Sequence, residues 1–430
     1  MEETLLKPVR GMRDLLPEDY YPLLEVGNRL CKVAELYGYQ RVETPAVEHF
    51  EILKAKAGEE VVNEIYYFKD KAGRELGLRF DLTVPIARVV SYRKDLPKPI
   101  RWYYFTKVWR YDEPQHGRYR EFHQFGIELI GTSSVYADAE VLQLLSDSLR
   151  YVSLENFEIR INDRQVVEHI LRNLGIDSNE LKVSILRILD KRGKVSDEEL
   201  RNMLTNLGLS VNIVDDLLNI ANIKVPLEKS VDILEDLKVP EHIVQRYSVL
   251  IEELKTSNHI SSMFYDFSIV RGLDYYTGFV FEVYVPEYRL AVGGGGRYDD
   301  LIRIYSGTEV PALGFAIGVE RLVEALTLQN KLPKPRLGPD FYIYVIKREG
   351  KLRELCYRIA TELRKRGYKV IIENSDKSLR AALEYASKLG ARYFIIVGPR
   401  EVEQGKVKLR DLEKWEEKEI AINELLGQYI

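Results

Sequence analysis

The chain has 430 residues, of which 45% are hydrophobic and 30% are charged, and its formal net charge is −4. These values predict a soluble globular protein of about two to four domains, and the lack of a run of about 18 apolar residues excludes a transmembrane helix. A charged N-terminus argues against a secretory signal, and two distant cysteines, Cys31 and Cys356, argue against a disulfide framework and favour a reducing cytoplasm.

The N-terminal third alternates helical and extended patterns. Apolar residues at helical spacing predict a helix over 18–38, which ends near Gly38. Extended segments follow, and a later strand runs into a helix whose first turn contains Pro85, where the missing N–H of proline costs nothing. Because side chains alternate along a strand, one face of this strand carries three polar residues: Arg79, Asp81 and Thr83.

Two strand-like runs within residues 101–131 flank a polar loop and predict a hairpin. Alternate side chains of the second run form an ordinary apolar face: Phe125, Ile127 and Leu129. The opposite face offers an aromatic ring, an amide, a gap without a side chain and a carboxylate: Phe122, Gln124, Gly126 and Glu128. Arg110 points into the same neighbourhood if the two runs pair. This face predicts the floor of a pocket for a small, polar, phosphorylated ligand, although an exposed amphipathic hairpin would show the same pattern.

The composition changes after residue 166. Residues 167–258 are poor in glycine and carry apolar residues at helical spacing, which predicts a helical insertion. Strand patterns return at 259–328, with a glycine run at Gly293–Gly296. A proline-rich linker follows, and 336–430 alternates short apolar strands with helices, the pattern of a parallel α/β sheet. These changes predict four segments: 1–166, 167–258, 259–328 and 336–430.

The chain lacks a P-loop, a dinucleotide-binding glycine motif, a zinc-protease motif and a serine-hydrolase motif. It has instead four arginines, each beside a glycine or an aromatic residue: Arg110, Arg118, Arg271 and Arg321. Guanidinium groups suit phosphate oxygens, so four of them near one site would neutralise a polyphosphate, whereas any one alone could be a solvated surface charge. Tyr275 and Tyr276 could be core aromatics, and Glu282 fits a structural ion pair better than a catalytic role.

These segments together resemble the class II aminoacyl-tRNA synthetases, and within that class the histidyl-tRNA synthetase family. The family's N-terminal signature resembles RGMRDLLPED, and motif 1, a dimer-interface element in the class, resembles YGYQRVETPAVEHFEIL. Motifs 2 and 3 resemble VWRYDEPQHGRYREFHQFGIELIG and GFAIGVERL. The match becomes specific with VRGLDYYTG, a peptide of histidyl enzymes that other class II enzymes lack. The C-terminal unit looks like the anticodon-binding domain of the same subgroup.

The resemblance implies an α+β fold. The expected parts are an antiparallel-sheet catalytic core, a helical insertion and a C-terminal α/β anticodon-binding domain: 1–166 with 259–328, 167–258 and 336–430. The resemblance also implies a cytoplasmic homodimer of the archaeal and eukaryotic branch, which ligates L-histidine to its cognate tRNA through a histidyl-adenylate. ATP with Mg²⁺ is the expected cosubstrate, and neither a tightly bound cofactor nor a membrane is expected.

The resemblance assigns roles at the nucleotide. Arg110 is expected to hold the α-phosphate of ATP, Arg321 the γ-phosphate, and Arg118 the region of the β- and γ-phosphates. Phe122 is expected to stack on adenine. Arg271 is expected to contact the α-phosphate opposite Arg110, supplying charge where relatives use a metal ion, and the ligands of any metal are left open. The residues expected to act in catalysis are Arg271, Arg110 and Gln124.

A second set of residues is expected to bind histidine. The substrate's α-amino group and carboxylate region would meet Asp81, Thr83 and Gln124. Glu128 and Tyr276 would bind the two ring nitrogens of imidazole, with Tyr275 nearby, and Arg271 belongs to this set as well. A site that hydrogen-bonds a substrate side chain rejects analogues lacking it by about 10⁴–10⁵, so no editing machinery is needed.

Two positions depart from the family pattern. Asp112 stands where motif 2 usually has a glutamate, so a direct contact with adenine would have to come from a shorter side chain. Asp81 replaces a glutamate of many bacterial members and keeps the amino-group role in the archaeal and eukaryotic branch. In the motif 2 loop, Gln115 and Arg120 are candidates to read the extra 5′ guanosine of the histidine tRNA.

The main alternative is a histidine-binding regulatory subunit of ATP phosphoribosyltransferase. Such chains resemble histidyl enzymes without charging tRNA, and they typically lack the C-terminal domain and degrade the VRGLDYYTG peptide. Both features are present here, and all four arginines are in place.

Overall fold

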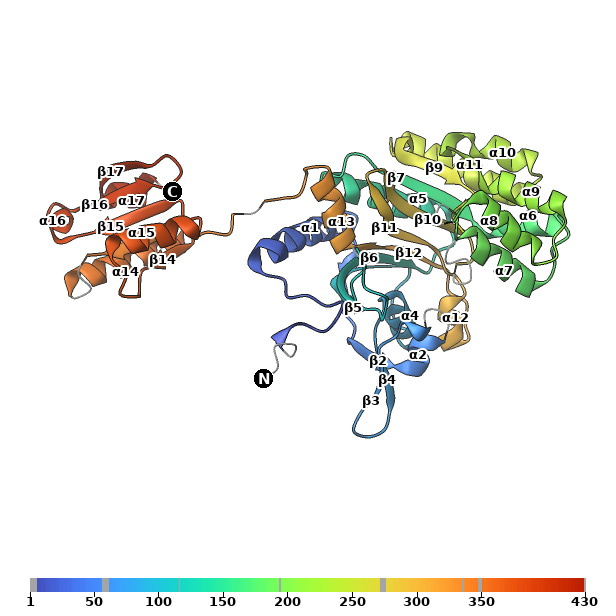
Figure 1. Ribbon diagram of the computed structural model, residues 1–430, viewed down its shortest axis with the longest axis horizontal. Helices are drawn as coiled ribbons and strands as arrows, with labels where there is room; N and C mark the ends of the chain where they lie inside the picture. The colour runs from blue at the N-terminus through green and yellow to red at the C-terminus, as the bar shows by residue number, and fades with distance from the viewer. Residues whose placement is uncertain are drawn as a thin grey trace. The chain divides into compact units, whose positions relative to one another are not determined.

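The computed structural model describes residues 6–55, 62–115, 117–192, 195–270, 276–334, 336–346 and 350–428 (Figure 1). The main chain forms two compact units, each with its own sheet and hydrophobic core. The first comprises Met1–Leu15 and Pro22–Pro333, and the second comprises Leu16–Tyr21 and Lys334–Ile430. Among the described residues, no helix is long and apolar enough to cross a membrane.

The first unit is built on a nine-stranded sheet in which neighbours are antiparallel except for the pairs β1–β5 and β7–β9. In sheet order the strands are β1 (Gln40–Arg41), β5 (Ile100–Trp109), β6 (Glu121–Ile130), β12 (Ala312–Gly318), β11 (Tyr288–Arg297), β10 (Phe279–Val285), β7 (Glu158–Asp163), β9 (Met263–Asp266) and β8 (Lys224–Pro226). The expected α+β fold with an antiparallel core sheet is confirmed.

One face of this sheet is buried under long helices. They are α1 (Pro17–Leu36), α5 (Val135–Tyr151), α11 (Glu241–Thr256) and α13 (Val319–Leu328). The apolar face predicted for the second strand of the hairpin contributes Phe125, Ile127 and Leu129 to this core, each fully buried. The opposite face of β6 is therefore the one that carries the predicted polar residues.

Two short helices lie over the polar face of the sheet. Helices α4 (Thr83–Tyr92) and α12 (Leu301–Ser306) pack against each other and against a smaller apolar cluster on β5 and β12 (Figure 1). Beside them, α2 (Phe50–Lys54) packs on a three-stranded sheet of β2 (Val47–His49), β4 (Glu75–Leu78) and β3 (Tyr67–Lys69). The expected strand face shared by Arg79, Asp81 and Thr83 was wrong, because β4 ends at Leu78. Asp81 lies in the connection to α4, Thr83 is the first residue of α4, and Arg79 is buried and donates to the carbonyl of Lys107 at 3.3 Å.

The predicted helical segment divides into two parts. Helices α6 (Arg164–Asn173), α7 (Asn179–Leu189), α8 (Asp197–Thr205) and α9 (Val211–Ala221) enclose a separate apolar core, and serine caps begin the last three of them. The chain then adds β8 to the edge of the large sheet. It continues through η2 (Leu227–Lys229), α10 (Ser230–Asp236), α11 and η3 (Ile260–Ser262), whose apolar residues join the main core.

The second unit has a five-stranded sheet with helices on both faces. Its strands in sheet order are β14 (Val370–Ile372), β13 (Phe341–Val345), β15 (Tyr393–Val397), β16 (Lys406–Asp411) and β17 (Glu416–Ala421). Its helices are α14 (Lys351–Lys365), α15 (Leu379–Lys388), α16 (Pro399–Glu403) and α17 (Ile422–Gln428). The first three strands are parallel, as predicted, but β16 and β17 form an antiparallel hairpin.

Candidate active site

The polar face of β6 forms the floor of the site. Glu128 is 1% exposed and lies between Trp102 of β5 and Gly314 of β12 in the sheet register. A Cβ on Gly314 would collide with Oε2 of Glu128, so this glycine makes room for the carboxylate. The register of β6 and β12 therefore provides the space that the Glu128 carboxylate occupies.

The gap predicted at Gly126 is not open. Tyr104 of β5 lies directly opposite Gly126 and is fully buried, and a Cβ on the glycine would collide with its ring and hydroxyl. The expectation of an empty position was therefore wrong: alternation assigns a residue to a face, but a ring from the neighbouring strand fills the space. Tyr104 is a site residue that the sequence analysis missed.

Both carboxylate oxygens of Glu128 have hydroxyl donors. Thr83, the first residue of α4, donates from Oγ1 to Oε1 of Glu128 at 2.7 Å, and Tyr298 donates to Oε2. Burial raises the pKa of Glu128 to about 8, an effect that the two hydroxyl groups oppose and Asp81 reinforces. Glu128 therefore changes charge close to neutral pH.

Asp81 and Tyr276 lie within electrostatic reach of Glu128. Burial raises the pKa of Asp81, while the guanidinium of Arg110 opposes the shift and the main-chain N–H of Val84 donates to Asp81 Oδ1 at 3.2 Å. Burial also raises the pKa of the Tyr276 phenol, with Glu128 and Asp81 adding to the effect and Arg110 opposing it. The structure thus brings two carboxyl groups, a phenol and a guanidinium together.

Arg110 connects this group to an aromatic surface. Its Nε donates to the carbonyl of Phe80 at 3.0 Å, and its Cζ lies 5.4 Å from the centre of the Phe122 ring. Phe122 is half-buried and packs on the cluster under α4 and α12. A fixed positive charge beside a flat apolar ring suits a phosphate joined to a nucleobase.

Arg321 lies in the first turn of α13 and holds the polar loop. Its Nε donates to the carbonyl of Gly117 at 2.8 Å, and its Nη1 donates to the carbonyl of Ala291 at 3.1 Å. The preceding Glu320 fixes this turn on β6, because its two carboxylate oxygens accept from the main-chain N–H of His123 at 3.0 and 2.9 Å. These contacts therefore hold Arg321 in a defined position.

Arg118 and Gln124 present buried polar atoms to the site. The Nε of Arg118 and the Oε1 of Gln124 have no hydrogen-bond partner among the described residues, and Gln124 is 5% exposed. Because buried polar groups are nearly always paired in folded proteins, each of these atoms needs an explanation. A bound polar ligand would provide one.

A carboxyl group that the sequence analysis did not single out joins the arginines. Burial raises the pKa of Glu64 to about 7, and Asp112 adds to the shift through its charge and a hydrogen bond, while Arg110 and Arg118 oppose it. Asp112 therefore shares its surroundings with a second carboxyl group. Nothing in the local pattern around Glu64 distinguishes it from a solvated charge.

The structure contradicts the expectation that Arg120 reads a nucleotide. Arg120 is 7% exposed, its Nε donates to the carbonyl of Asp112 at 2.9 Å, and its guanidinium carbon lies 3.9 Å from the centre of the Tyr111 ring. Both contacts are with residues of the same loop, so the guanidinium is not directed toward a nucleotide. Gln115, by contrast, is exposed.

Two predicted site residues, Arg271 and Tyr275, lie outside the described residues, so their roles stay predictions. Tyr298 was missed although it follows the predicted glycine run by two positions, because an aromatic residue there is equally typical of a core. Among the residues that the structure describes, no three or more His, Cys, Asp or Glu side chains are grouped so that they could hold a metal ion.

Comparisons with known proteins agree with this geometry. The sequence profile described as "Histidyl-tRNA synthetase" matches residues 11–322, and the profile "Anticodon binding domain" matches residues 340–428. A curated relative from Pyrobaculum aerophilum, a "Histidine--tRNA ligase", is 51% identical over 99% of this chain and 99% of its own length.

Solved structures have the same fold. The histidyl-tRNA synthetase from Nostoc sp. PCC 7120 aligns with a TM-score of 0.83 and 26% identity over 98% of each chain. A protein from Bacillus halodurans C described as "ATP phosphoribosyltransferase regulatory subunit/histidyl-tRNA synthetase" aligns with a TM-score of 0.79 and 25% identity, covering 93% of this chain and all of its own. The chain belongs to the histidyl-tRNA synthetase family.

Proposed function

We propose that this chain joins L-histidine to the histidine tRNA in two steps. A carboxylate oxygen of histidine attacks the α-phosphorus of ATP, the bond to the leaving pyrophosphate breaks, and histidyl-adenylate forms. A ribose hydroxyl at the tRNA terminus then attacks the carbonyl carbon of the adenylate and displaces AMP. Positioning and stabilisation of developing charge carry both steps, because phosphoryl and acyl transfer here need no covalent enzyme intermediate.

The observation that carries the proposal is the buried carboxyl of Glu128, held by Thr83 and Tyr298 beside the phenol of Tyr276. Imidazole presents one N–H donor and one acceptor nitrogen. A carboxylate that accepts from the N–H and a phenol that meets the other nitrogen fit this ring. Asp81 is then placed for the positively charged α-amino group, which would also return its pKa toward the ordinary range.

The arginines provide the nucleotide half of the proposed site. Arg110, next to Phe122, binds the α-phosphate while the phenyl ring stacks on adenine. Arg321 and Arg118 bind the β- and γ-phosphates, and Gln124 lies between the nucleotide and the histidine carboxylate. Arg271 adds a second charge at the α-phosphate. Mg²⁺ is expected to accompany ATP as part of the cosubstrate.

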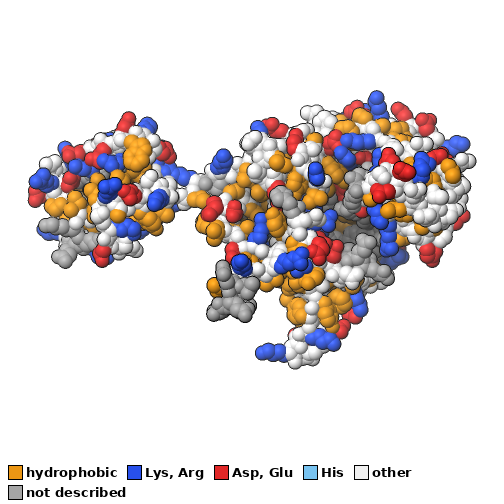
Figure 2. All heavy atoms as spheres, in the orientation of Figure 1, with side chains coloured by type: hydrophobic (Ala, Val, Ile, Leu, Met, Phe, Trp, Pro, Cys, Tyr) orange, Lys and Arg blue, Asp and Glu red, His pale blue; other side chains and the backbone are white. Residues whose placement is uncertain are grey.

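Three further features complete the proposal. The second unit binds the anticodon, which its match to an anticodon-binding profile supports. The chain works as a cytoplasmic homodimer. One face of the β2–β4–β3 sheet carries two exposed apolar side chains suited to burial in such an assembly, Val47 and Phe68. Figure 2 shows apolar surface in orange over this sheet, at the lower centre.

The regulatory alternative is less well supported. It would need histidine binding without tRNA charging, yet the chain carries a complete second unit and covers 99% of relatives that are histidine–tRNA ligases. Arg110, Arg118 and Arg321 are all present, and a histidine sensor does not require such a set of arginines.

The test is ATP–pyrophosphate exchange with each of the twenty amino acids. Exchange with histidine alone, followed by transfer of labelled histidine to its tRNA, is the expected result. Tight histidine binding without any exchange would contradict the proposal and favour the regulatory alternative.

A further inference from the structure

The main chain at Tyr276–Gly278, the last three residues of the histidine-specific peptide, leads directly into β10. Three consecutive carbonyl groups in this stretch accept hydrogen bonds from the first two residues of α6. Arg164 Nη1 donates to the carbonyl of Tyr276 at 2.9 Å, Gln165 Nε2 donates to that of Thr277 at 3.2 Å, and the main-chain N–H of Arg164 donates to that of Gly278 at 3.0 Å. The first two residues of α6 therefore hold the main chain of Tyr276–Gly278 in place.

The first turn of α6 is itself held by two further contacts. Asp163 caps α6, accepting from the main-chain N–H of Gln165 at 2.7 Å, and it is 4% exposed. Arg164 Nε donates to Glu168, one turn along the helix, at 2.7 Å. This ion pair restricts the guanidinium, so that its Nη1 has a fixed direction toward Tyr276.

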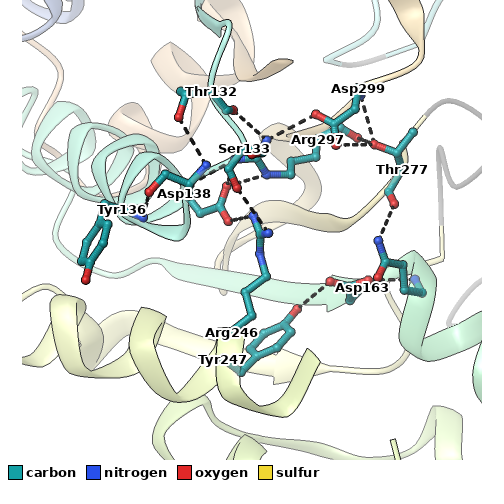
Figure 3. A network of polar contacts seen from close by, with 12 residues as sticks. Thr132, Ser133, Tyr136, Asp138, Asp163, Arg246, Tyr247, Thr277, Arg297 and Asp299 are labelled. Atoms are coloured by element: carbon teal, nitrogen blue, oxygen red, sulfur yellow. Dashed lines mark hydrogen bonds and ion pairs between the residues drawn. The ribbon is translucent and has the colours of Figure 1, made fainter. Parts of the chain in front are cut away.

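The other side of the same stretch is held by β11 and the residues after it. Thr277 donates from its main-chain N–H to the carbonyl of Arg297 at 2.7 Å, and its Oγ1 accepts from the main-chain N–H of Asp299 at 3.0 Å (Figure 3). Arg297 is 3% exposed and pairs with Asp138 of α5, which also pairs with Arg246 of α11. The network in Figure 3 thus runs from α11 to Thr277.

The position of this main chain decides where the Tyr276 phenol lies. The ring packs over Gly296, where a Cβ would approach its Cδ1 to 2.9 Å, and the phenol lies in the field of Glu128 and Asp81. A displacement of the main chain by about 1 Å would weaken the hydrogen bond between this hydroxyl and a bound imidazole.

We propose that Arg164 is a positioning residue for histidine recognition: from the first turn of α6 it fixes the main chain of Tyr276 and so ties the helical α6–α9 part to the amino-acid pocket. The inference rests on the proposed role of Tyr276. Among the described residues, the Arg164 side chain donates to Glu168 and to the carbonyl of Tyr276, and it acts on the pocket through that carbonyl.

The test compares Arg164→Ala with Arg172→Ala, an exposed arginine in the last turn of the same helix. In pyrophosphate exchange, Arg164→Ala is expected to raise the KM for histidine roughly 10- to 100-fold while the KM for ATP changes less than about threefold. Arg172→Ala is expected to match the parent chain. Arg164→Lys, which keeps one donor, is expected to recover part of the loss.

A double-mutant cycle with Tyr276→Phe separates positioning from a general structural role. If Arg164 acts through Tyr276, then Arg164→Ala has little further effect on the histidine KM once the phenol hydroxyl is gone. An equal effect in both backgrounds, or an equal rise in the KM for histidine and ATP, would overturn the inference. Should Arg164→Ala fail to fold, Glu168→Gln, which only frees the guanidinium, gives the same comparison with a smaller expected shift.

The cycle also distinguishes this inference from the proposed function. A normal histidine KM in Tyr276→Phe itself would refute the role of Tyr276, and with it this inference. A raised KM in Tyr276→Phe together with a normal KM in Arg164→Ala would refute the positioning role and leave the proposed function standing.

Discussion

The two halves of the site differ in how their polar groups are paired. The proposed histidine end comprises Asp81, Thr83, Glu128, Tyr276 and Tyr298. The proposed phosphate end comprises Arg110, Arg118, Phe122 and Arg321. At the histidine end, side chains hold one another inside the core, as Thr83 and Tyr298 hold Glu128. At the phosphate end, arginines donate to main-chain carbonyls, and the Nε of Arg118 has no partner among the described residues.

This difference follows from what each end has to recognise. A small ring with two distinct nitrogens requires fixed partners, and a buried carboxyl with a raised pKa is the cost of keeping them in place. A polyphosphate carries enough charge to displace carbonyl acceptors from guanidinium groups. The histidine end should therefore be costly for stability and sensitive to small changes, and the phosphate end more tolerant.

The largest effect expected is on stability. The pKa of Glu128 rises from its ordinary 4.5 to about 8 on folding, so the folded chain binds more protons than the unfolded chain between these values. The free energy of unfolding should fall as the pH rises through this window, by up to about 1.4 kcal/mol per pH unit from this group. Denaturant unfolding should be measured from pH 5 to pH 9. Over this range the free energy of unfolding of the parent should fall by several kcal/mol more than that of Glu128→Gln.

The exposed carboxylate variant Glu198→Gln is the matched control for this measurement and should run parallel to the parent at every pH. A pH-independent difference between Glu128→Gln and the parent would mean that Glu128 is not held in a costly environment. The histidine end would then not be more costly for stability than the phosphate end.

The same substitution should impair function. In Glu128→Gln the amide cannot provide two acceptor oxygens to Thr83, Tyr298 and imidazole together, so kcat/KM for histidine should fall about 100-fold or more, while the KM for ATP stays close to normal. Pyrophosphate exchange at varied histidine and fixed saturating ATP measures this split. Equal losses for both substrates would show that the two ends are not separable.

Arg321→Ala tests the phosphate end. Loss of the guanidinium should raise the KM for ATP roughly 10- to 50-fold, and Arg321→Lys should be intermediate because a point charge replaces a planar fork. The histidine KM should change little. As a control for disturbance of α13, Gly318→Ala adds a methyl group that meets only ordinary van der Waals contacts; it should behave as the parent does.

The smallest effect is expected from Tyr298→Phe. The lost hydroxyl removes about 1 kcal/mol of hydrogen bonding to Glu128. Because that hydrogen bond lowers the pKa of Glu128, its removal should move the pKa above about 8. The pH dependence of the histidine KM should shift upward accordingly, and an unchanged profile would show that Tyr298 does not tune the carboxylate.

Alternation along strands was enough to predict the polar face of β6 and the apolar face behind it, because every second residue faces the same way. It could not predict what lies over that face. Tyr104 fills the space at Gly126 because of the register of the β5–β6 hairpin, which alternation alone does not define. Tyr298 follows β11 and reaches Glu128 of β6 because only β12 separates these two strands in the sheet. Glu64 was missed because its approach to Asp112, Arg110 and Arg118 is a tertiary contact with no signal in the local sequence.

The strand β17 was missed for a different reason. Its first four residues are charged and exposed, and among its residues only Ile420 is fully buried, at 2% exposure. It pairs with β16 through opposite charges, such as Arg410 with Glu417 at 2.8 Å and Lys406 with Glu419 at 3.8 Å. A pattern based on apolar alternation has no signal for such an edge strand.

The most direct test of the contrast is a crystal structure of the chain with histidine and a non-hydrolysable ATP analogue. The account predicts that Glu128 keeps its hydroxyl partners and binds the imidazole without moving, whereas Arg110 and Arg321 exchange carbonyl oxygens for phosphate oxygens. A Glu128 side chain rotated away from Thr83 and Tyr298, or a histidine bound elsewhere, would contradict it.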